Sequence, residues 1–178
     1  MKKFVLLCLI LPFAIATAFE SEEISYIFSP GSHETSGSDN ASLVQSFYEA
    51  FEKNNASLLQ GTLSDGYKVN TIAQIHQLAS AQFDSGSKDL TIKMEAYSNA
   101  FPNLSVKIEQ LIASDNKVVA QVSMTGIQKG TFFGIAPTNR YITVHTIAIF
   151  TIANGKITQI DEMTSEYNLM RQLGYIAI

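Results

Sequence analysis

The sequence predicts an α+β fold, in which helices come first and an antiparallel sheet follows. Apolar residues recur at helical spacing between positions 43 and 101, and after Pro102 their period changes from 3.6 to 2. The dipeptide Asn154-Gly155 between two alternating segments is typical of a type I′ β-hairpin. This separation of helices and strands along the chain favours helices packed on one face of a curved sheet.

Three of the expected helices end at residues that disfavour their continuation. Asn54-Asn55 ends the first helix, Pro102 ends the helix before the sheet, and Gly174 caps the last one. The predicted helices span residues 42–53, 57–63, 72–83, 87–100 and 165–173. The predicted strands span residues 67–69, 104–113, 117–128, 141–153 and 156–164.

The N-terminus is predicted to be a signal peptide that is removed. A basic pair precedes an apolar segment at residues 4–15, and the A-T-A that ends at Ala18 matches an A-x-A cleavage site. The apolar segment is too short to span a bilayer as a helix, so an uncleaved anchor is the less favoured alternative. We expect a periplasmic or secreted protein after cleavage near Ala18, with a flexible arm at residues 19–41 and one domain at residues 42–178.

Composition excludes several classes of chemistry. Cleavage would remove Cys8, the one cysteine of the 178-residue chain. An exported protein without thiols cannot use disulfides, a thiolate nucleophile or a cysteine metal site, so its stability must come from the apolar core. Loss of the two N-terminal lysines takes the basic residues from 12 to 10 against 16 acidic residues, a net charge of −6. This charge argues against nucleic acid or an anionic membrane surface as a partner.

The hairpin predicts which side chains of the last two strands share a face. If the register continues unbroken from the two-residue turn, Ala148 lies opposite Asp161. Asp161, Met163 and Ser165 are then expected to point into the interior, and Gln128 on the preceding strand shares that face. Both faces are half apolar, so the outer face is expected to form a homodimer.

Four short motifs lie between residues 100 and 174. They are A-F-P-N-L at 100–104, G-x-x-x-G-I-x-P-T-x-R at 130–140, G-K-I at 155–157 and R-Q-L-G at 171–174. With these motifs, the chain resembles the SnoaL-like polyketide cyclases, or ester cyclases, of the nuclear-transport-factor-2-like superfamily from about Leu43 to Gly174. The resemblance implies a cone-shaped fold, with three helices over a curved sheet around a deep apolar pocket. It supports a fold more strongly than an activity.

The residues that carry chemistry in this family are replaced in this chain. The resemblance implies an aspartate at the start of the last helix, which takes a proton from the substrate carbon, and assisting histidines in the pocket. Ser165 occupies the aspartate's position, and Gln128 and Asn70 occupy the positions of two histidines. Amides do not titrate and a serine hydroxyl needs an activating base, so none of these three is a general base near neutral pH. Asp161, where the family often has Trp, is the candidate for a relocated catalytic base.

The expected pocket is apolar with a few polar groups. Its predicted residues are Asn70, Met94, Tyr97, Phe101, Met124, Gln128, Phe133, Met163 and Ser165. His33, His76 and His145 form no cluster with metal-ligand spacing, and no nucleotide-binding motif is present, so neither a metal nor a cofactor is expected. His145 is expected on the outer sheet face, diagonal to Glu162.

Three functions remain open from the sequence. The leading hypothesis is an exported protein that binds a small hydrophobic or aromatic molecule and has lost the family's acid–base residues. The alternative is a cyclase-like or isomerase-like enzyme that uses Asp161 as its base. The second alternative is a non-catalytic dimeric interaction module, with the outer sheet face as its interface.

Overall fold

A computed structural model describes residues 26–28, 34–71 and 87–176 of the protein. The predicted signal peptide, the predicted helix at 72–83 and the histidines His33 and His76 lie outside the described residues. In the part of the chain that is described, no helix combines the length and the hydropathy that a membrane span requires.

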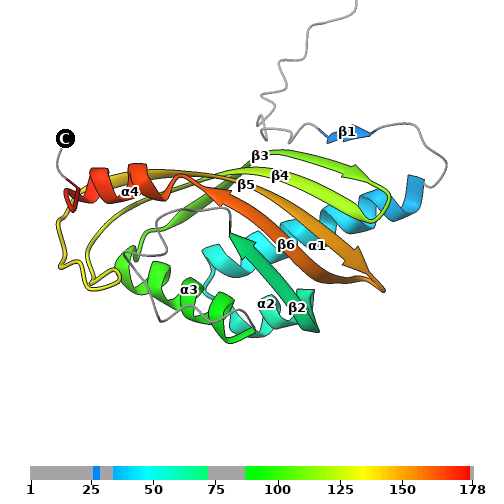
Figure 1. The fold of residues 1–178 in the computed structure, drawn as a ribbon, viewed down its shortest axis with the longest axis horizontal. Helices are drawn as coiled ribbons and strands as arrows, with labels where there is room; N and C mark the ends of the chain where they lie inside the picture. The colour runs from blue at the N-terminus through cyan, green and yellow to red at the C-terminus, as the bar shows by residue number, and fades with distance from the viewer. Residues whose placement is uncertain (1–25, 29–33, 72–86, 177–178) are drawn as a thin grey trace, which may run out of the picture.

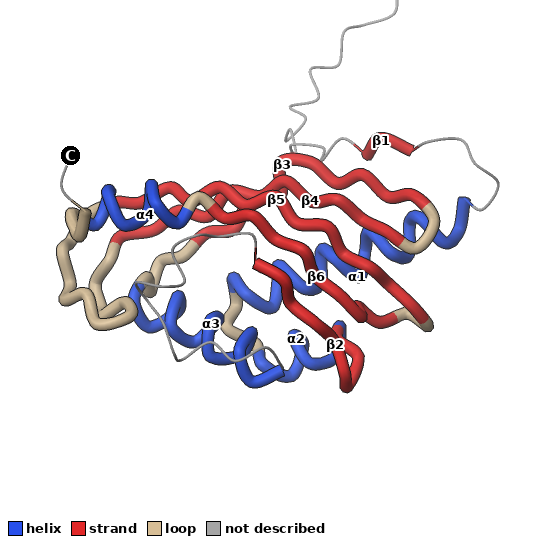
Figure 2. The backbone as a smooth tube through the Cα atoms, viewed as in Figure 1, coloured by secondary structure: helices blue, strands red, loops and turns tan. Residues whose placement is uncertain are grey.

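The molecule is one mixed sheet with helices packed against it, which confirms the predicted α+β class (Figure 1). The strands are β1 (Tyr26–Phe28), β2 (Leu63–Thr71), β3 (Ser105–Ser114), β4 (Lys117–Ile127), β5 (Tyr141–Ala153) and β6 (Lys156–Thr164). The helices are α1 (Glu34–Glu52), α2 (Ala56–Thr62), α3 (Ser87–Ala100) and α4 (Glu166–Leu173). Helices α1, α2 and α3 lie together on one side of the sheet, and α4 lies beside the N-terminal end of β5 (Figure 2).

The strand order is β1-β3-β4-β5-β6-β2, and only its central part is antiparallel. Strands β3, β4, β5 and β6 form the predicted antiparallel meander. The two edge strands instead join in parallel, β1 against β3 and β2 against β6. The antiparallel sheet predicted from the sequence is therefore confirmed for β3 to β6, whereas the two edge strands are parallel to their neighbours, because the chain between the paired strands contains helices.

Burial alternates along β5, as its apolar period predicts. Its buried side chains on the interior face are Ile142, Val144, Thr146, Ala148, Phe150 and Ile152. On α1, the Phe47 ring packs edge-on against Phe150, with centroids 5.3 Å apart. At the other end of the interior, the Tyr97 ring of α3 packs against Phe132 at 5.0 Å. Aromatic side chains thus fill the space between the helices and the sheet at both ends.

A β-bulge in β6 overturns the predicted register. The pairs next to the turn are as expected, but between Ile152 and Thr151 the register shifts and Thr151 pairs with Gln159. The extra residue moves every later β6 side chain to the opposite face. Ala148 therefore lies opposite Glu162, whereas Asp161 pairs with an outward-facing residue of β5.

The first helix begins earlier than its apolar pattern predicts. Helix α1 starts at Glu34, inside the segment 19–41 that was expected to be a flexible arm. Ala41 is buried one turn before Val44, so the apolar face of α1 continues past the predicted start at residue 42. The bounds of α3, β5 and β6, by contrast, are those predicted.

Candidate functional site

The Gln128 amide organises the loop that follows β4. Its side chain is fully buried, and Nε2 donates to the carbonyl oxygens of Gly130 at 3.1 Å, Ile135 at 3.1 Å and Ala136 at 3.3 Å. Its Oε1 accepts from the backbone N–H of Thr138 at 3.1 Å and from the hydroxyl of the same residue at 2.6 Å. Both ends of the amide are thus occupied by the loop, so this side chain supports the loop and offers no acid or base to the interior.

Gly130 holds the same loop against the end of α3. The backbone N–H groups of Lys129 and Gly130 donate to the carbonyl of Ala100, at 2.8 and 3.1 Å. A Cβ at position 130 would lie 2.1 Å from the carbonyl oxygen of Asn99, which no real side chain tolerates. The glycine is therefore required by close backbone approach.

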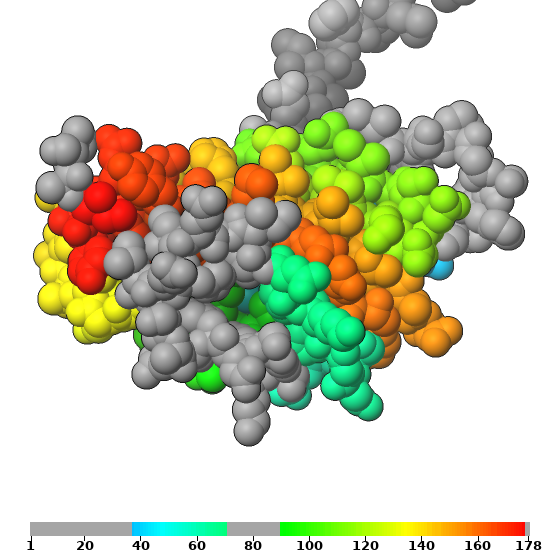
Figure 3. Space-filling model, in the orientation of Figure 1, coloured from blue at the N-terminus to red at the C-terminus, as the bar shows by residue number. Residues whose placement is uncertain are grey.

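The loop and the last helix are also joined to each other. Arg140 Nη1 donates to the carbonyl of Gln172 at 3.2 Å. The Gln172 amide bonds both the N–H and the carbonyl of Thr143 on β5, at 2.7 and 2.9 Å. Gly174 has φ +78°, and a Cβ there would meet the Arg140 guanidinium. The loop and α4 lie side by side at one end of the molecule, in yellow and red (Figure 3). The motifs at 130–140 and 171–174 thus hold the loop and α4 together.

Ser165 does not point toward a substrate as the resemblance implies for that position. Its hydroxyl accepts from the backbone N–H of His145 at 2.9 Å, and its own N–H donates to the His145 carbonyl at 2.9 Å. The residue thus continues the β5–β6 ladder by one step before α4 begins. His145 is exposed on the outer face as predicted, but Glu162 is not beside it there.

Asp161 lies on the outer face, contrary to the predicted register. Asn70 Nδ2 donates to Asp161 Oδ1 at 2.6 Å, and Gln159 Nε2 donates to both carboxylate oxygens, at 3.0 and 2.9 Å. These hydrogen bonds, that from Asn70 first, lower the pKa of the Asp161 carboxyl. Asn70 is exposed, and Met163 also faces outward with 54% of its surface exposed. The arrangement joins β2 to β6 and does not bring Asp161, Asn70 or Met163 into the interior.

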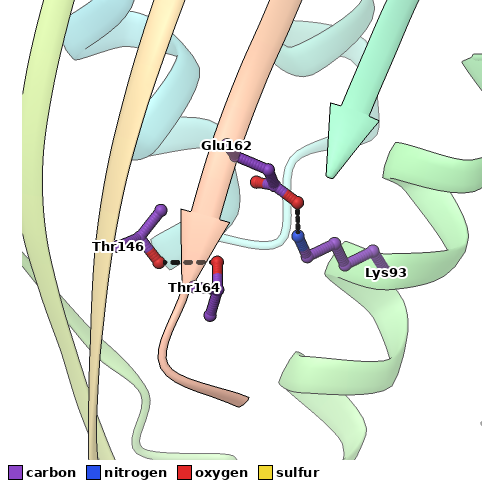
Figure 4. A network of polar contacts seen from close by, with 4 residues as sticks. All are labelled: Lys93, Thr146, Glu162 and Thr164. Carbon is purple, nitrogen blue, oxygen red and sulfur yellow. Dashed lines mark hydrogen bonds and ion pairs between the residues drawn. The ribbon is translucent and has the colours of Figure 1, made fainter. Parts of the chain in front are cut away.

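The carboxylate that the bulge turns inward is Glu162. It forms an ion pair with Lys93 of α3, and the two side chains are only 11% and 16% exposed (Figure 4). Two residue pairs further along the sheet, on the same face, the hydroxyls of Thr146 and Thr164 are hydrogen-bonded at 3.0 Å. The interior of the described fold therefore contains a compact polar centre between α3 and β6.

Two buried tyrosines, Tyr48 and Tyr97, have raised pKa values, to which the Glu162 charge contributes. Burial raises the pKa of Tyr48 above its usual range, and the negative charge of Glu162 adds to the effect. The pKa of Tyr97 is raised for the same first reason, with smaller contributions from Glu166 and Glu162. Both phenols therefore stay neutral at any physiological pH.

The remaining predicted pocket residues lie in the interior. Met94, Tyr97, Phe101 and Met124 are buried, and Phe133 is half-buried against the Phe132 ring. Among the described residues, no group of three His, Cys, Asp or Glu side chains is placed to hold a metal ion.

Sequence reasoning missed Glu162 and Lys93. A signal for Glu162 was present, because Ile157 and Ile160 are three residues apart and break the period of two that an unbulged strand requires. Lys93 carried no signal of its own, since a single lysine on an amphipathic helix is most often solvated.

Comparisons with solved structures agree with this fold. A candidate polyketide cyclase from Bacillus cereus ATCC 10987 superposes with a TM-score of 0.71 at 21% identity, covering 88% of this chain and 97% of the other. TsrD from Streptomyces laurentii gives a TM-score of 0.67 at 22% identity, covering 78% and 97%. An NTF2-like protein of unknown function from Burkholderia pseudomallei K96243 gives 0.60 at 12% identity, covering 76% and 97%. These likenesses concern the fold alone.

Comparison with curated proteins finds no match. The sequence of residues 42–173, however, matches the family described as SnoaL-like polyketide cyclase. This segment includes the interlocked loop and last helix, as well as the strands that form the interior face. The chain therefore belongs to the SnoaL-like polyketide cyclase family.

Proposed function

We propose that this protein binds a small hydrophobic or aromatic molecule between the sheet and α3, and that it does so without the acid–base residues of its family. The hydrogen bonds of Gln128 carry the proposal. At the position where the resemblance implies a histidine, the chain has an amide whose donors and acceptor are engaged by the loop. Ser165 is engaged by the strand ladder in the same way.

The side chains around the interior suit such a ligand. Tyr97, Phe101 and Phe132 form a cluster of aromatic rings with centroids 5.0–6.0 Å apart. Met94 and Met124 are buried on α3 and β4. Aromatic rings and methionines are the usual lining of sites for apolar small molecules, because the rings give rigid contact area and the thioethers adapt to shape.

Native mass spectrometry of the protein purified from the periplasm tests this function. We expect a mass increment from a retained small molecule, and we expect Met124→Trp to abolish it, because the larger ring fills the interior. Gln121→Trp, on the exposed face of the same strand, is the matched control and should keep the ligand. A wild-type protein that carries no ligand and binds no aromatic probe would contradict the proposal.

Mass spectra of the periplasmic and cytoplasmic fractions, measured side by side, test where the protein resides. We propose export with cleavage near Ala18, as the N-terminal sequence predicts. A periplasmic species that has lost residues 1–18 would support this proposal, and a full-length species confined to the cytoplasm would contradict it.

A homodimer through the outer sheet face is a further part of the proposal. Ile112, Ile147, Ile149 and Met163 are between 38% and 54% exposed on neighbouring strands. An exposed apolar area of this kind is typical of a surface that a second copy of the chain covers. We expect a dimer in the mass spectrum that Ile147→Lys converts to a monomer; a wild-type monomer at micromolar concentration is the contrary result.

Glu162 supports a second candidate function, an acid–base enzyme with a base other than the one predicted from the sequence. Its buried carboxylate could accept a C–H proton next to a substrate carbonyl, and the Lys93 ammonium could hydrogen-bond the enolate oxygen until the proton returns to carbon. The substrate class would be ketones with an acidic C–H bond.

Deuterium exchange into 2-tetralone tests the enzyme directly. Exchange above the buffer rate should be lost in Glu162→Gln and kept in Asp161→Asn, whose carboxylate lies on the outer face. Exchange that persists in Glu162→Gln, or that never exceeds the buffer rate in the wild type, argues for binding alone.

A further inference from the structure

We propose that the Lys93–Glu162 pair recognises an uncharged oxygen group, a hydroxyl or a carbonyl, on the aromatic ligand. This inference rests on the proposed binding function and names the chemical class of its ligand. It makes the pair a specificity determinant at the polar end of an otherwise apolar interior.

The Lys93–Glu162 pair is largely buried among apolar side chains. The side chains of Lys93 and Glu162 are 16% and 11% exposed, and their neighbours on α3 and β6 include the buried Leu90, Met94 and Ile160. Removing two charges from water costs about as much as their attraction returns, so such a pair is weak evidence for a role in stability. A role in recognition accounts for its place in an apolar interior.

The pair lies next to the cluster of aromatic rings. Lys93 and Tyr97 are four residues apart on α3 and therefore neighbours on one face of the helix. Tyr97 in turn packs against Phe101 and Phe132. A ring lying along this face of α3 would have the aromatic cluster at one end and the ammonium at the other. The hydroxyls of Thr146 and Thr164 lie on the sheet opposite, two residue pairs beyond Glu162 (Figure 4).

The charge of the pair selects a neutral ligand. An ammonium has three N–H donors, and among the described residues the structure gives Lys93 Nζ one acceptor, the Glu162 carboxylate. A carbonyl or hydroxyl oxygen can accept a further hydrogen bond from Lys93 while the ion pair stays intact. An anionic ligand would compete with Glu162 for the ammonium and would leave a net negative charge in the interior, which is costly.

Two probes of matched shape test the inference on the mature protein. Titration calorimetry with 1-naphthol and 1-methylnaphthalene compares an oxygen with a methyl group at one position of the same ring. We expect the wild type to bind 1-naphthol more tightly by about tenfold or more, since a hydrogen bond to a charged group has roughly that effect on affinity. Lys93→Met/Glu162→Leu should remove this preference, because it removes the ammonium donor and the carboxylate acceptor together, and it should leave the affinity for 1-methylnaphthalene unchanged or higher.

Glu95→Gln is the matched control, because Glu95 is exposed on α3 and should not alter either affinity. Lys93→Met alone keeps the Glu162 carboxylate, which can accept a hydrogen bond from the naphthol hydroxyl, so this variant should keep part of the preference. Equal affinities of the wild type for the two probes, or a preference that survives undiminished in the double variant, would overturn the inference while leaving the binding function intact. Failure of both probes to bind the wild type would instead overturn the binding function, and the inference with it.

Discussion

Gln128 and the Lys93–Glu162 pair are both buried polar groups, but their hydrogen bonds serve different parts of the molecule. The Gln128 amide is neutral and bonds to backbone and hydroxyl groups within ten residues of its own position. Lys93 and Glu162 are charged, are 69 residues apart in the sequence, and join a helix to a strand. The first centre shapes a loop, whereas the second presents charge to an aromatic interior.

The two centres are expected to contribute differently to stability and to ligand selectivity. A saturated neutral network is worth most to stability, because each of its partners would be left buried and unpaired if the network were lost. A buried ion pair returns little net stability, because desolvation offsets its attraction. The comparison therefore predicts large stability effects at the loop and small ones at the pair, with the reverse order for ligand selectivity.

The largest effect is expected for Gln128→Leu. This substitution leaves the carbonyls of Gly130, Ile135 and Ala136 without their donor, so the free energy of unfolding should fall by about 3 kcal/mol. Urea denaturation followed by circular dichroism measures the change. Gln121→Leu, on the exposed face of β4, is the control and should stay within about 0.5 kcal/mol of the wild type. A loss below about 1 kcal/mol at Gln128 would show that water replaces the amide, and the comparison would fail.

A smaller but still marked effect is expected for Gly130→Ala. The new Cβ would meet the Asn99 carbonyl at 2.1 Å, so the loop must move away from α3. We expect a loss of about 2 kcal/mol in the free energy of unfolding, as for other overpacked sites. Gly66→Ala is the control, since a Cβ at that position has no atom within 4 Å. Equal stability of the two variants would mean that the contact between the loop and α3 is not tight in solution.

The ion pair should behave differently when one charge or both are removed. Lys93→Met removes the ion-pair partner of the buried Glu162 carboxylate, and we expect a loss of about 1.5 kcal/mol, reduced from the value for fully buried pairs by the partial exposure of both side chains. Lys93→Met/Glu162→Leu should recover most of this loss. Thermal or urea unfolding of the single and the double variant, measured side by side, tests whether stability is recovered. A double variant that is less stable than the single one would make the pair part of the scaffold, like Gln128.

The sequence placed Gln128 on the interior face correctly, but it placed Glu162 on the wrong face of the sheet. The reason lies in the strand β6. The Asn154-Gly155 turn and the apolar alternation of β5 predict the bounds of β5 and β6 to the residue, because turn geometry and burial act locally. The bulge after Ile157 is also local, but it appears only as a spacing of three between two isoleucines. It reverses the faces of Asp161 and Glu162, so a prediction made one residue out of register selects the wrong carboxylate.

Long-range pairing was less accessible still. The parallel attachment of β1 and β2 to opposite edges of the sheet depends on where the helices between them pack. Similarly, the sequence could place Gln128 on the interior face but could not identify its partners. Those partners are backbone carbonyls of a loop. Every residue has a backbone carbonyl, so the residue types do not indicate which carbonyls Gln128 binds.

The smallest effect is expected for the polar group on the outer face, which provides the solvated limit of the comparison. Asn70 and Gln159 hydrogen-bond the ionised Asp161 and hold its pKa below the ordinary value of 3.8. A carboxyl whose pKa is lowered by folding contributes stability above its unfolded pKa, and loses that contribution as the pH falls through its folded pKa. Asn70→Ala should therefore lower the free energy of unfolding by only about 0.5 kcal/mol at pH 7, because the group is screened by water.

That difference between the wild type and Asn70→Ala should shrink as the pH falls below 3.8. In an Asp161→Asn background, which has no titrating group at this position, the effect of Asn70→Ala should not change with pH in this range. Urea midpoints measured from pH 7 to the acid limit of folding test both statements. A difference that grows on acidification would mean that Asn70 supports the β2–β6 contact mainly when Asp161 is protonated, which is contrary to the hydrogen bonds observed. A loss as large as that at Gln128 would show that hydrogen bonds at the surface and in the interior of this fold contribute alike, and burial would no longer explain the contrast between the two centres.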